Sequence, residues 1–509
     1  MNSSCQNEKC RKISCMDNRK NDTRPRSIKP STLLSGLGNV FRDPSPQVVA
    51  SYRMQSTPSN SVDVFLSHVW ASNATLRYSG LLWYRNAITA SCLSILTVLL
   101  VSAILAESYD GRAWVRFESR TLLTTHSILS LFGTALLIIL LFSIHFILKL
   151  LRFREPNFFM DRCCIEQMDH ELKMSEIRQI PQIIEKSRSM LILLSENYFK
   201  RLWCCYEIAI YVGLQRERQP IFLHLRLVAI TLLILLSDLI YIVLIRSNLR
   251  TYAEPHSGEA KRALTFYLLT VLYSLLLSGL CLGFAVIWSR ENRRHRQIIS
   301  EFTLPNAECS DPDDRQTIQA GIAERFGSIE RFDHFVRTEI LDLVTQASSP
   351  RLQFTLVAGL PQLFALLGYI NILSQRIGLY CMFALDAVFV PKDDSFCVVL
   401  DRERWANAIV ILSQFVRYIC FYPVIFRLLI LGCDWVDTRF SHSKFSMHSI
   451  FCGMFAIELG YIIFSNWKFH EKDSIVIQGV EAGLLLCTFG FFEIRERFHR
   501  QRASQFPKQ

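Results

Sequence analysis

Several recognisable catalytic and metal-binding motifs are missing from this chain of 509 residues. It has no P-loop, no G-x-S-x-G nucleophile elbow, no His-rich metal motif and no EF-hand loop. Its 16 cysteines form no spacing typical of a zinc site, and several of them lie within apolar runs. We therefore expect reduced cytosolic thiols and no metal site.

Strong charge of one sign is also missing. The formal net charge of +11 is modest for this length, and the basic residues lie in polar segments between apolar ones. In a membrane protein such charge records orientation across the bilayer. The sequence therefore gives no reason to expect a nucleic-acid partner.

Apolar residues, by contrast, make up 50% of the chain, and phenylalanine alone occurs 36 times. Runs of about 20 apolar residues are long enough to cross a bilayer core as helices. Eight such runs lie at 87–106, 122–148, 225–245, 264–288, 354–373, 407–431, 446–465 and 475–492. A weaker run at 378–390 leaves that count open by one or two. We expect an α-helical multi-pass protein of about eight spans, with the lipid bilayer as its partner.

The polar segments predict the orientation of the spans. Basic residues concentrate at 149–162, at 289–296 and in the tail at 493–509. The positive-inside rule therefore predicts that both termini are cytosolic, without selecting a particular membrane. Residues 1–60 lack a periodic apolar pattern and are expected to be a disordered tail.

Residues 289–350 form another expected cytosolic segment. Two amphipathic helices are predicted there, with a break at Gly327-Ser328. We expect them to pack against the neighbouring domain or the membrane face.

Strands and helices alternate between residues 158 and 225. Short apolar runs at 158–160, 189–195 and 220–223 predict strands, and helical patterns at 177–184 and 201–212 separate them. This alternation predicts a parallel, doubly wound sheet. An earlier strand is predicted upstream, at 62–68.

The sequence SENYFKRLWCCYE at 195–207 resembles the S-x-N-Y … W-C-x-x-E element of Toll/interleukin-1 receptor (TIR) domains. RQPIF at 218–222 is similar to the strand that follows it, and VDVFLSH at 62–68 to the opening strand. The resemblance implies a flavodoxin-like TIR domain split by a transmembrane hairpin, of a type seen in multi-span proteins of protists and unicellular algae. The implied organisation is a first TIR part at 61–86, a hairpin at 87–148, a second TIR part at 149–224, a second hairpin at 225–288 and a C-terminal membrane bundle at 351–492.

Glu207 is the first residue to consider for chemistry. No cationic side chain lies three or four residues away on its helix, so it is no ordinary member of a surface ion pair. Trp203 and Tyr211 form an aromatic stripe around it. Burial among these rings would raise the pKa of its carboxyl group.

The resemblance adds a role for this residue. In TIR domains that cleave NAD, the glutamate of the W-C-x-x-E element is catalytic, which implies that role for Glu207. Ser67 and His68 lie near the carboxyl end of the first predicted strand, where open α/β sheets bind ligands. Trp203 and Tyr211 could stack on a base or on nicotinamide, and Cys204 completes the expected binding set. NAD would be a substrate, and no cofactor would be required.

Two other classes of function stay open. The resemblance also fits a non-catalytic scaffold that signals by self-association or by pairing with other TIR-like domains. A transporter or channel is the third reading, because ionisable residues inside apolar runs are costly unless they are paired or line a path. Those residues are Asp238, Arg417, Arg427, Glu458 and Glu481.

Overall fold

The computed structural model describes residues 24–42, 45–108, 120–214, 219–251, 259–309 and 311–346, with isolated positions between 357 and 430. The chain divides into two compact units. The first draws on residues 1–85, 145–225 and 293–348, and the second on 86–144, 226–292 and 349–509.

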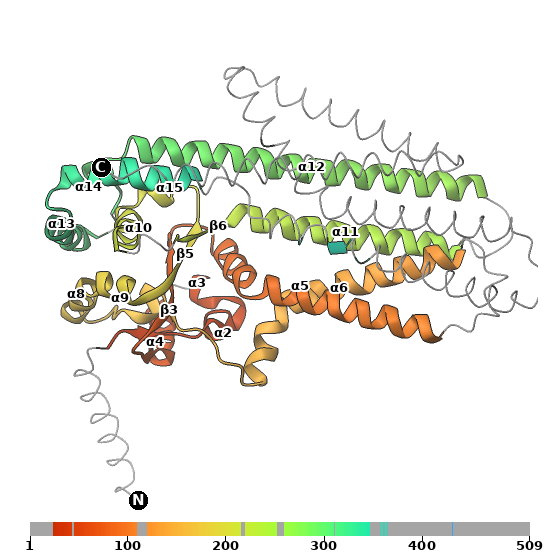
Figure 1. Ribbon diagram of the computed structural model, residues 1–509, viewed down its shortest axis with the longest axis horizontal. Helices are drawn as coiled ribbons and strands as arrows, with labels where there is room; N and C mark the ends of the chain where they lie inside the picture. Colours follow the sequence, from red (N-terminus) through yellow and green to blue (C-terminus); the bar gives the residue numbers. More distant parts are fainter. Residues whose placement is uncertain are drawn as a thin grey trace, which may run out of the picture. The chain divides into compact units, whose positions relative to one another are not determined.

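A four-stranded parallel sheet is the centre of the first unit (Figure 1). Its spatial order is β4, β3, β5, β6, so β3 and β5 are the inner strands. The strands are β3 (Val62–His68), β4 (Phe158–Phe159), β5 (Ser187–Leu194) and β6 (Ile221–His224). The inner strands read as near-continuous apolar runs because helices cover both faces of such a sheet. The predicted strands and their parallel arrangement are confirmed.

The sheet joins two distant parts of the chain. In β3, Phe65 pairs with Phe159 of β4 on one side and with Met190 of β5 on the other. Two long helices, α5 (Ala74–Ser108) and α6 (Arg120–Leu150), lie between β3 and β4 in the sequence. The hairpin is therefore inserted between two neighbouring strands of one sheet.

Helices connect the remaining strands with small departures from expectation. They are α7 (Asp161–Cys164), α8 (His170–Arg178), α9 (Ile180–Lys186), the 3₁₀ turn η3 (Tyr198–Lys200) and α10 (Leu202–Leu214). The single helix expected over 177–184 divides at Gln179, because Pro181 lacks an N–H group and occupies the first turn of a new helix. Helix α10 extends to Leu214, two residues beyond the helical pattern at 201–212.

The expectation of disorder over 1–60 is wrong for the described residues 24–42 and 45–60. They form a β-ribbon of β1 (Arg26–Ser27) with β2 (Thr57–Pro58), the helices α2 (Pro30–Leu33), α3 (Asn39–Arg42) and α4 (Pro46–Gln55), and the turn η1 (Ser35–Leu37). Scattered apolar residues, among them Leu34 and Phe41, are buried although they follow no sequence period. Arg53 fastens α4 by donating to the Cys164 carbonyl and to Glu176 Oε1 at 2.6 Å. Residues 1–23 lie outside the described part of the chain.

The segment after residue 300 also packs on this unit. It contains η4 (Leu304–Asn306), α13 (Pro312–Phe326), α14 (Ile329–Phe335), the π-helical turn η5 (Val336–Ile340) and α15 (Leu341–Gln346). The predicted break is confirmed: Gly327 has a φ of 81°, and the Ser328 side chain accepts from the Arg331 N–H. Helix α13 lies beside α10 (Figure 1).

The second unit is helical. Besides most of α5 and α6, it contains α11 (Leu225–Thr251) and most of α12 (Glu259–Ser300). Within the described residues, three helices are long and apolar enough to cross a membrane: Ala74–Ile104, Ile128–Leu150 and Leu225–Leu244. The expected span 264–288 lies in α12, where several side chains are outside the description. The expected spans at 354–373, 407–431, 446–465 and 475–492 lie outside the described residues, apart from isolated positions, so the count of eight stays an expectation.

Candidate functional site

Ser67 and Glu207 meet at the carboxyl end of the sheet. Ser67 is the penultimate residue of β3, and Glu207 lies on α10 in the segment beyond the hairpin. The Ser67 hydroxyl donates to Glu207 Oε2 at 2.5 Å, and its Oγ also lies 2.6 Å from the Tyr198 hydroxyl oxygen. We call these three residues the buried cluster, because Ser67, Tyr198 and Glu207 are 1%, 0% and 3% exposed.

The buried cluster changes the protonation of Glu207. Burial raises the pKa of its carboxyl group from 4.5 to about 8, because no cation compensates the loss of water. The hydrogen bond from Ser67 lowers the pKa and nearby Asp161 raises it. The Trp203 indole N–H also lowers the pKa, although its Nε1 does not meet normal hydrogen-bond geometry. At neutral pH the group is therefore mostly protonated, and its expected raised pKa agrees with the structure.

A small cleft of about 190 Å³ opens at the same edge of the sheet. Three of the residues expected to bind a nucleotide, His68, Trp203 and Cys204, line it together with Arg162 and Lys173. Ser67 and Glu207 are not among the residues that line it. The structure thus brings three of the five expected binding residues to one cleft, and the expected catalytic carboxyl group lies beneath the surface.

His68, which lines this cleft, has an unpaired ring nitrogen that is itself buried. The residue is 6% exposed, and its Nε2 has no hydrogen-bond partner. Burial, together with the positive charges of Arg77 and Arg162, holds the pKa of the imidazole well below its usual range. His68 is therefore neutral at physiological pH. Its Nε2 can still accept or donate one hydrogen bond.

The wall of the cleft next to His68 contains residues that the sequence did not single out. The Trp70 indole donates to Asp161 Oδ2 at 2.8 Å, and the Arg162 guanidinium lies 3.7 Å from the Trp70 ring centroid. Trp70 follows β3 and Asp161 follows β4. Adjacent parallel strands end at the same sheet edge. The positions of Trp70 and Asp161 after two predicted strands were therefore the sequence signal that could have placed them together.

A second, larger cleft of about 630 Å³ lies between α8, α10 and α13. Its lining includes Arg178, Tyr206 and Arg325, and it shares Ile177 and Trp203 with the smaller cleft. Trp203 therefore stands between two neighbouring clefts. Tyr211, which we expected to stack on a ligand, is completely buried and is not among the lining residues of either cleft.

Ion pairs at the rim fasten α13 to α8. Lys173 Nζ lies 3.0 Å from Asp311 Oδ2 and 3.4 Å from Asp314 Oδ1, and His170 Nε2 lies 3.1 Å from Asp313 Oδ2. We call these five residues the ion-pair belt. Two backbone hydrogen bonds extend the attachment, from the Leu202 N–H to the Glu308 carbonyl (2.9 Å) and from the Glu308 N–H to the Lys200 carbonyl (2.8 Å).

One ionisable residue of the apolar runs, Asp238 on α11, can also be located. Asp238 is 2% exposed and accepts a hydrogen bond from the Tyr273 hydroxyl of α12. The other ionisable residues expected within apolar runs, Arg417, Arg427, Glu458 and Glu481, lie outside the described residues. Within the described part of the chain, no group of three or more His, Cys, Asp or Glu side chains could hold a metal ion.

Comparison with protein families gives one match: residues 144–226 match the TIR domain family. The match spans β4 to β6 and includes Glu207, but it covers about a sixth of the chain and does not reach β3. Comparison with curated proteins and with solved structures gives no match. The chain thus contains a TIR domain of flavodoxin-like α/β type, a signalling module that commonly self-associates or pairs with other TIR domains.

Proposed function

We propose that this chain is a membrane-embedded signalling protein whose TIR domain, completed by β3 from before the hairpin, hydrolyses NAD through Glu207. One observation carries the proposal. Ser67 and Glu207, from the two sides of the inserted hairpin, share a 2.5 Å hydrogen bond next to a cleft at the carboxyl end of the inner strands. Open α/β sheets bind their ligands at such edges.

The proposed chemistry needs a carboxylate beside the nicotinamide ribose. Breaking the bond between C1′ of the ribose and the nicotinamide nitrogen leaves positive charge on the ribose, and an adjacent carboxylate stabilises that charge. Water then adds at C1′, so that the products are nicotinamide, ADP-ribose and a proton. His68 Nε2 and the Trp203 ring are available to orient the ribose and the leaving group.

The described conformation corresponds to a resting form in this proposal. Glu207 is protonated and does not line the cleft, whereas catalysis needs it ionised and in contact with the ribose. Movement of Trp203 and Cys204 would bring water to the carboxyl group and return its pKa toward 4.5. Assembly of several TIR domains would supply the free energy for that movement.

The two clefts together fit a dinucleotide better than either cleft does alone. Ligand sites usually enclose about 300–1,000 Å³, and the smaller cleft holds about 190 Å³. In the proposal it takes the nicotinamide ribose. The adenosine half extends past Trp203 into the cleft of about 630 Å³.

The test is NAD consumption by the full-length protein in nanodiscs. Wild type should release nicotinamide at high protein density. Glu207→Gln should abolish release, because an amide keeps the shape and the Ser67 contact without ever ionising. Glu171→Gln, an exposed glutamate on α8, is the matched control and should retain activity. Absence of turnover from a protein shown to be folded and assembled would exclude the hydrolase.

A non-catalytic scaffold is the second candidate, and a specific observation favours it. A buried, neutral glutamate held by Ser67 is also what a purely structural hydrogen-bond cluster requires. In that case Glu207→Gln should leave both self-association and signalling unchanged. A transporter is the third reading: Asp238→Asn should then abolish flux, whereas a structural bridge to Tyr273 predicts no change in flux.

The membrane placement is part of the same proposal. Three candidate spans support it. In the proposal both termini and the TIR domain are cytosolic. Alkaline carbonate should leave the protein in the membrane pellet. Terminal tags should be accessible to protease only from the cytosolic side.

A further inference from the structure

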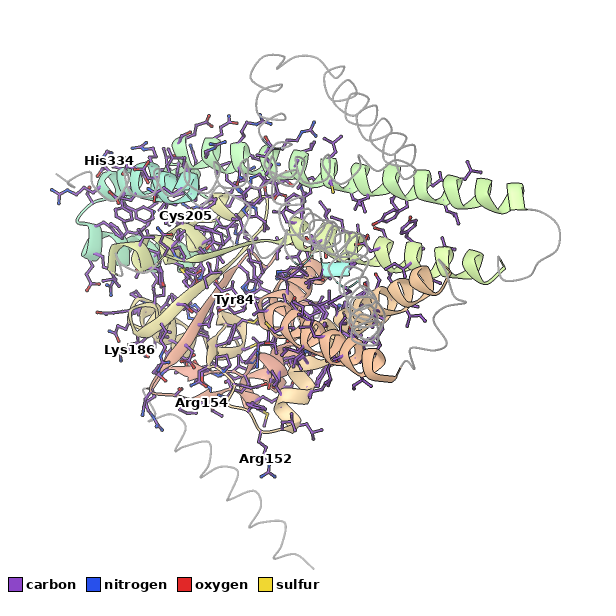
Figure 2. All side chains as sticks on the ribbon, turned by 45° about the vertical axis from the view of Figure 1, so that its right-hand side comes forward. Tyr84, Arg152, Arg154, Lys186, Cys205 and His334 are labelled. Carbon is purple, nitrogen blue, oxygen red and sulfur yellow. The ribbon has the colours of Figure 1, made fainter. Side chains whose placement is uncertain are left out.

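A short stretch of exposed apolar and basic residues follows helix α6. Leu150, Leu151 and Phe153 are 82%, 62% and 60% exposed, and Arg152 and Arg154 between and beyond them are exposed as well. Most of the large apolar side chains near the sheet are buried by comparison. We call residues 150–154 the LLRFR turn, and Figure 2 shows Arg152 extending from it away from the neighbouring ribbon.

The LLRFR turn has a fixed backbone. The Phe153 N–H donates to the Leu148 carbonyl and the Arg152 N–H to the Lys149 carbonyl, both at 3.0 Å. These two bonds form a Schellman motif, which ends a helix with one left-handed residue. That residue is Arg152, with a φ of 57°.

The chain is fastened again directly after the turn. Lys29 Nζ donates to the Glu155 carbonyl at 2.9 Å and to Asn157 Oδ1 at 2.7 Å, and the Ser31 hydroxyl donates to Glu155 Oε2 at 2.7 Å. The exposed side chains therefore stand on a rigid turn held at both ends.

Arginine is an unexpected residue at the left-handed position. Glycine is preferred there because it has no Cβ, and other residues are strained. Strained residues persist at functional sites when their side chains are needed. The position thus indicates that the Arg152 side chain has a task other than ending the helix.

The charges around the turn are of one sign and lack partners. Lys149, Arg152 and Arg154 have no ion-pair or hydrogen-bond partner for their side chains among the described residues. No acidic residue occurs between Glu118 and Glu155, and Glu155 itself is buried and turned toward Ser31. The surface is thus complementary to fixed negative charge.

The apolar residues continue the surface of a candidate span. Phe142 and Phe146, eight and four residues before Leu150 on α6, are 44% and 49% exposed. The span Ile128–Leu150 ends where the turn begins. Aromatic and aliphatic residues with interleaved cations are typical of the boundary between acyl chains and headgroups.

We infer that the LLRFR turn binds anionic phospholipids at the membrane surface, with Leu151 and Phe153 in the acyl boundary and Arg152 and Arg154 on the headgroup phosphates. The inference rests on the membrane embedding proposed above. It gives α6 a fixed depth in the bilayer and orients the strand β4 that follows it a few residues later.

Native mass spectrometry of the full-length protein in detergent tests the inference. Equal amounts of phosphatidylglycerol and phosphatidylcholine with the same acyl chains are added, and the bound lipids are counted. Wild type should prefer phosphatidylglycerol. Arg152→Gln/Arg154→Gln should reduce that preference roughly 25-fold, since each basic residue at an anionic surface contributes roughly fivefold. Lys186→Gln/Arg331→Gln removes the same charge from exposed sites elsewhere on this unit and should change nothing.

A second variant separates binding from folding. Arg152→Gly relieves the left-handed strain and should raise the melting temperature by roughly 2–4 °C. The same variant should weaken phosphatidylglycerol binding about fivefold. A purely structural turn would gain stability and keep its lipid preference, which would overturn the inference.

The other possible outcomes of these experiments also test the inference. Equal binding of both lipids by wild type overturns the inference, as does displacement of phosphatidylglycerol by inorganic phosphate, which would indicate a soluble ligand. Release of the chain by alkaline carbonate would instead refute the membrane embedding itself. Retention in the pellet without lipid preference refutes only the role of the turn.

Discussion

The buried cluster and the ion-pair belt are two polar groupings of the same unit with opposite surroundings. In the buried cluster, burial keeps Glu207 protonated, and the hydroxyl of Ser67 satisfies it. In the belt, Asp311 is about one third exposed and its pKa is held below the usual value by hydrogen bonds from Lys173 and from backbone N–H groups. The comparison indicates that the first grouping couples stability to the protonation of one buried carboxyl group, whereas the second contributes little to stability and is screened by salt.

The largest expected effect is a dependence of stability on pH that comes from Glu207. Its folded pKa of about 8 lies above the value of 4.5 expected when the chain is unfolded. The native state therefore holds the proton more tightly. The contribution is complete below pH 4.5 and is lost as the pH rises toward 8, at about 1.4 kcal/mol for each pH unit. Thermal unfolding in nanodiscs between pH 4 and 9 should show this decline.

Glu207→Gln is the control for the pH experiment. The amide cannot ionise, so the variant should lose much of the decline in stability above pH 4.5. An unchanged pH profile in this variant would show that the decline comes from other groups.

The next effect is the removal of the same side chain. Glu207→Ala leaves a cavity and deprives the buried Ser67 hydroxyl of its acceptor, which should cost about 3 kcal/mol. Glu207→Gln preserves the volume and should cost less than about 1 kcal/mol. Differential scanning fluorimetry of both variants at pH 6 measures the contrast. Equal losses would indicate that the hydrogen bond to Ser67 contributes little.

A third variant tests whether α13 is held by packing as well as by charge. A Cβ on Gly321 would collide with the Tyr206 hydroxyl, because α13 approaches α10 closely there. Gly321→Ala should therefore destabilise the packing of α13 on α10 by about 2 kcal/mol, despite the better helix propensity of alanine. Hydrogen exchange in α13 should increase. Ala320→Gly, at the neighbouring exposed position, should cost only the propensity difference of about 1 kcal/mol.

The smallest effect is expected at the belt itself. Lys173→Gln removes contacts to both Asp311 and Asp314. Partly exposed ion pairs contribute about 1 kcal/mol or less, so the melting temperature should hardly change. Exchange at the first turn of α13 should nevertheless increase, and 0.5 M salt should reproduce that increase in wild type. A melting temperature as low as that of Glu207→Ala would show that the ion-pair belt contributes as much to stability as the buried cluster does.

Much of the sheet and part of the site could be predicted from the sequence. The strands followed from short apolar runs between turn signals, and the absence of a cation around Glu207 correctly indicated burial. The described residues 24–42 and 45–60 were misjudged because their buried side chains have no period and depend on surfaces elsewhere in the chain. The contact of Trp70 with Asp161 was missed for a related reason: the two residues lie on opposite sides of the hairpin.

The acidic residues at 311–314 show the same limit. They are neighbours in the sequence, but the sequence does not show that Lys173 is their partner. Local patterns specify elements, whereas the pairing of distant elements depends on tertiary contacts.

The position of β3 has a consequence for how the protein is made. β3 is an inner strand, yet both of its neighbours are encoded after the hairpin. In the membrane topology proposed above, this strand leaves the ribosome long before its partners and stays unpaired while α5 and α6 enter the bilayer. The sheet can close only if the hairpin returns the chain to the side from which it left. In that proposal, completion of the sheet would depend on correct hairpin topology, and misinserted chains would display an unpaired strand to chaperones and proteases.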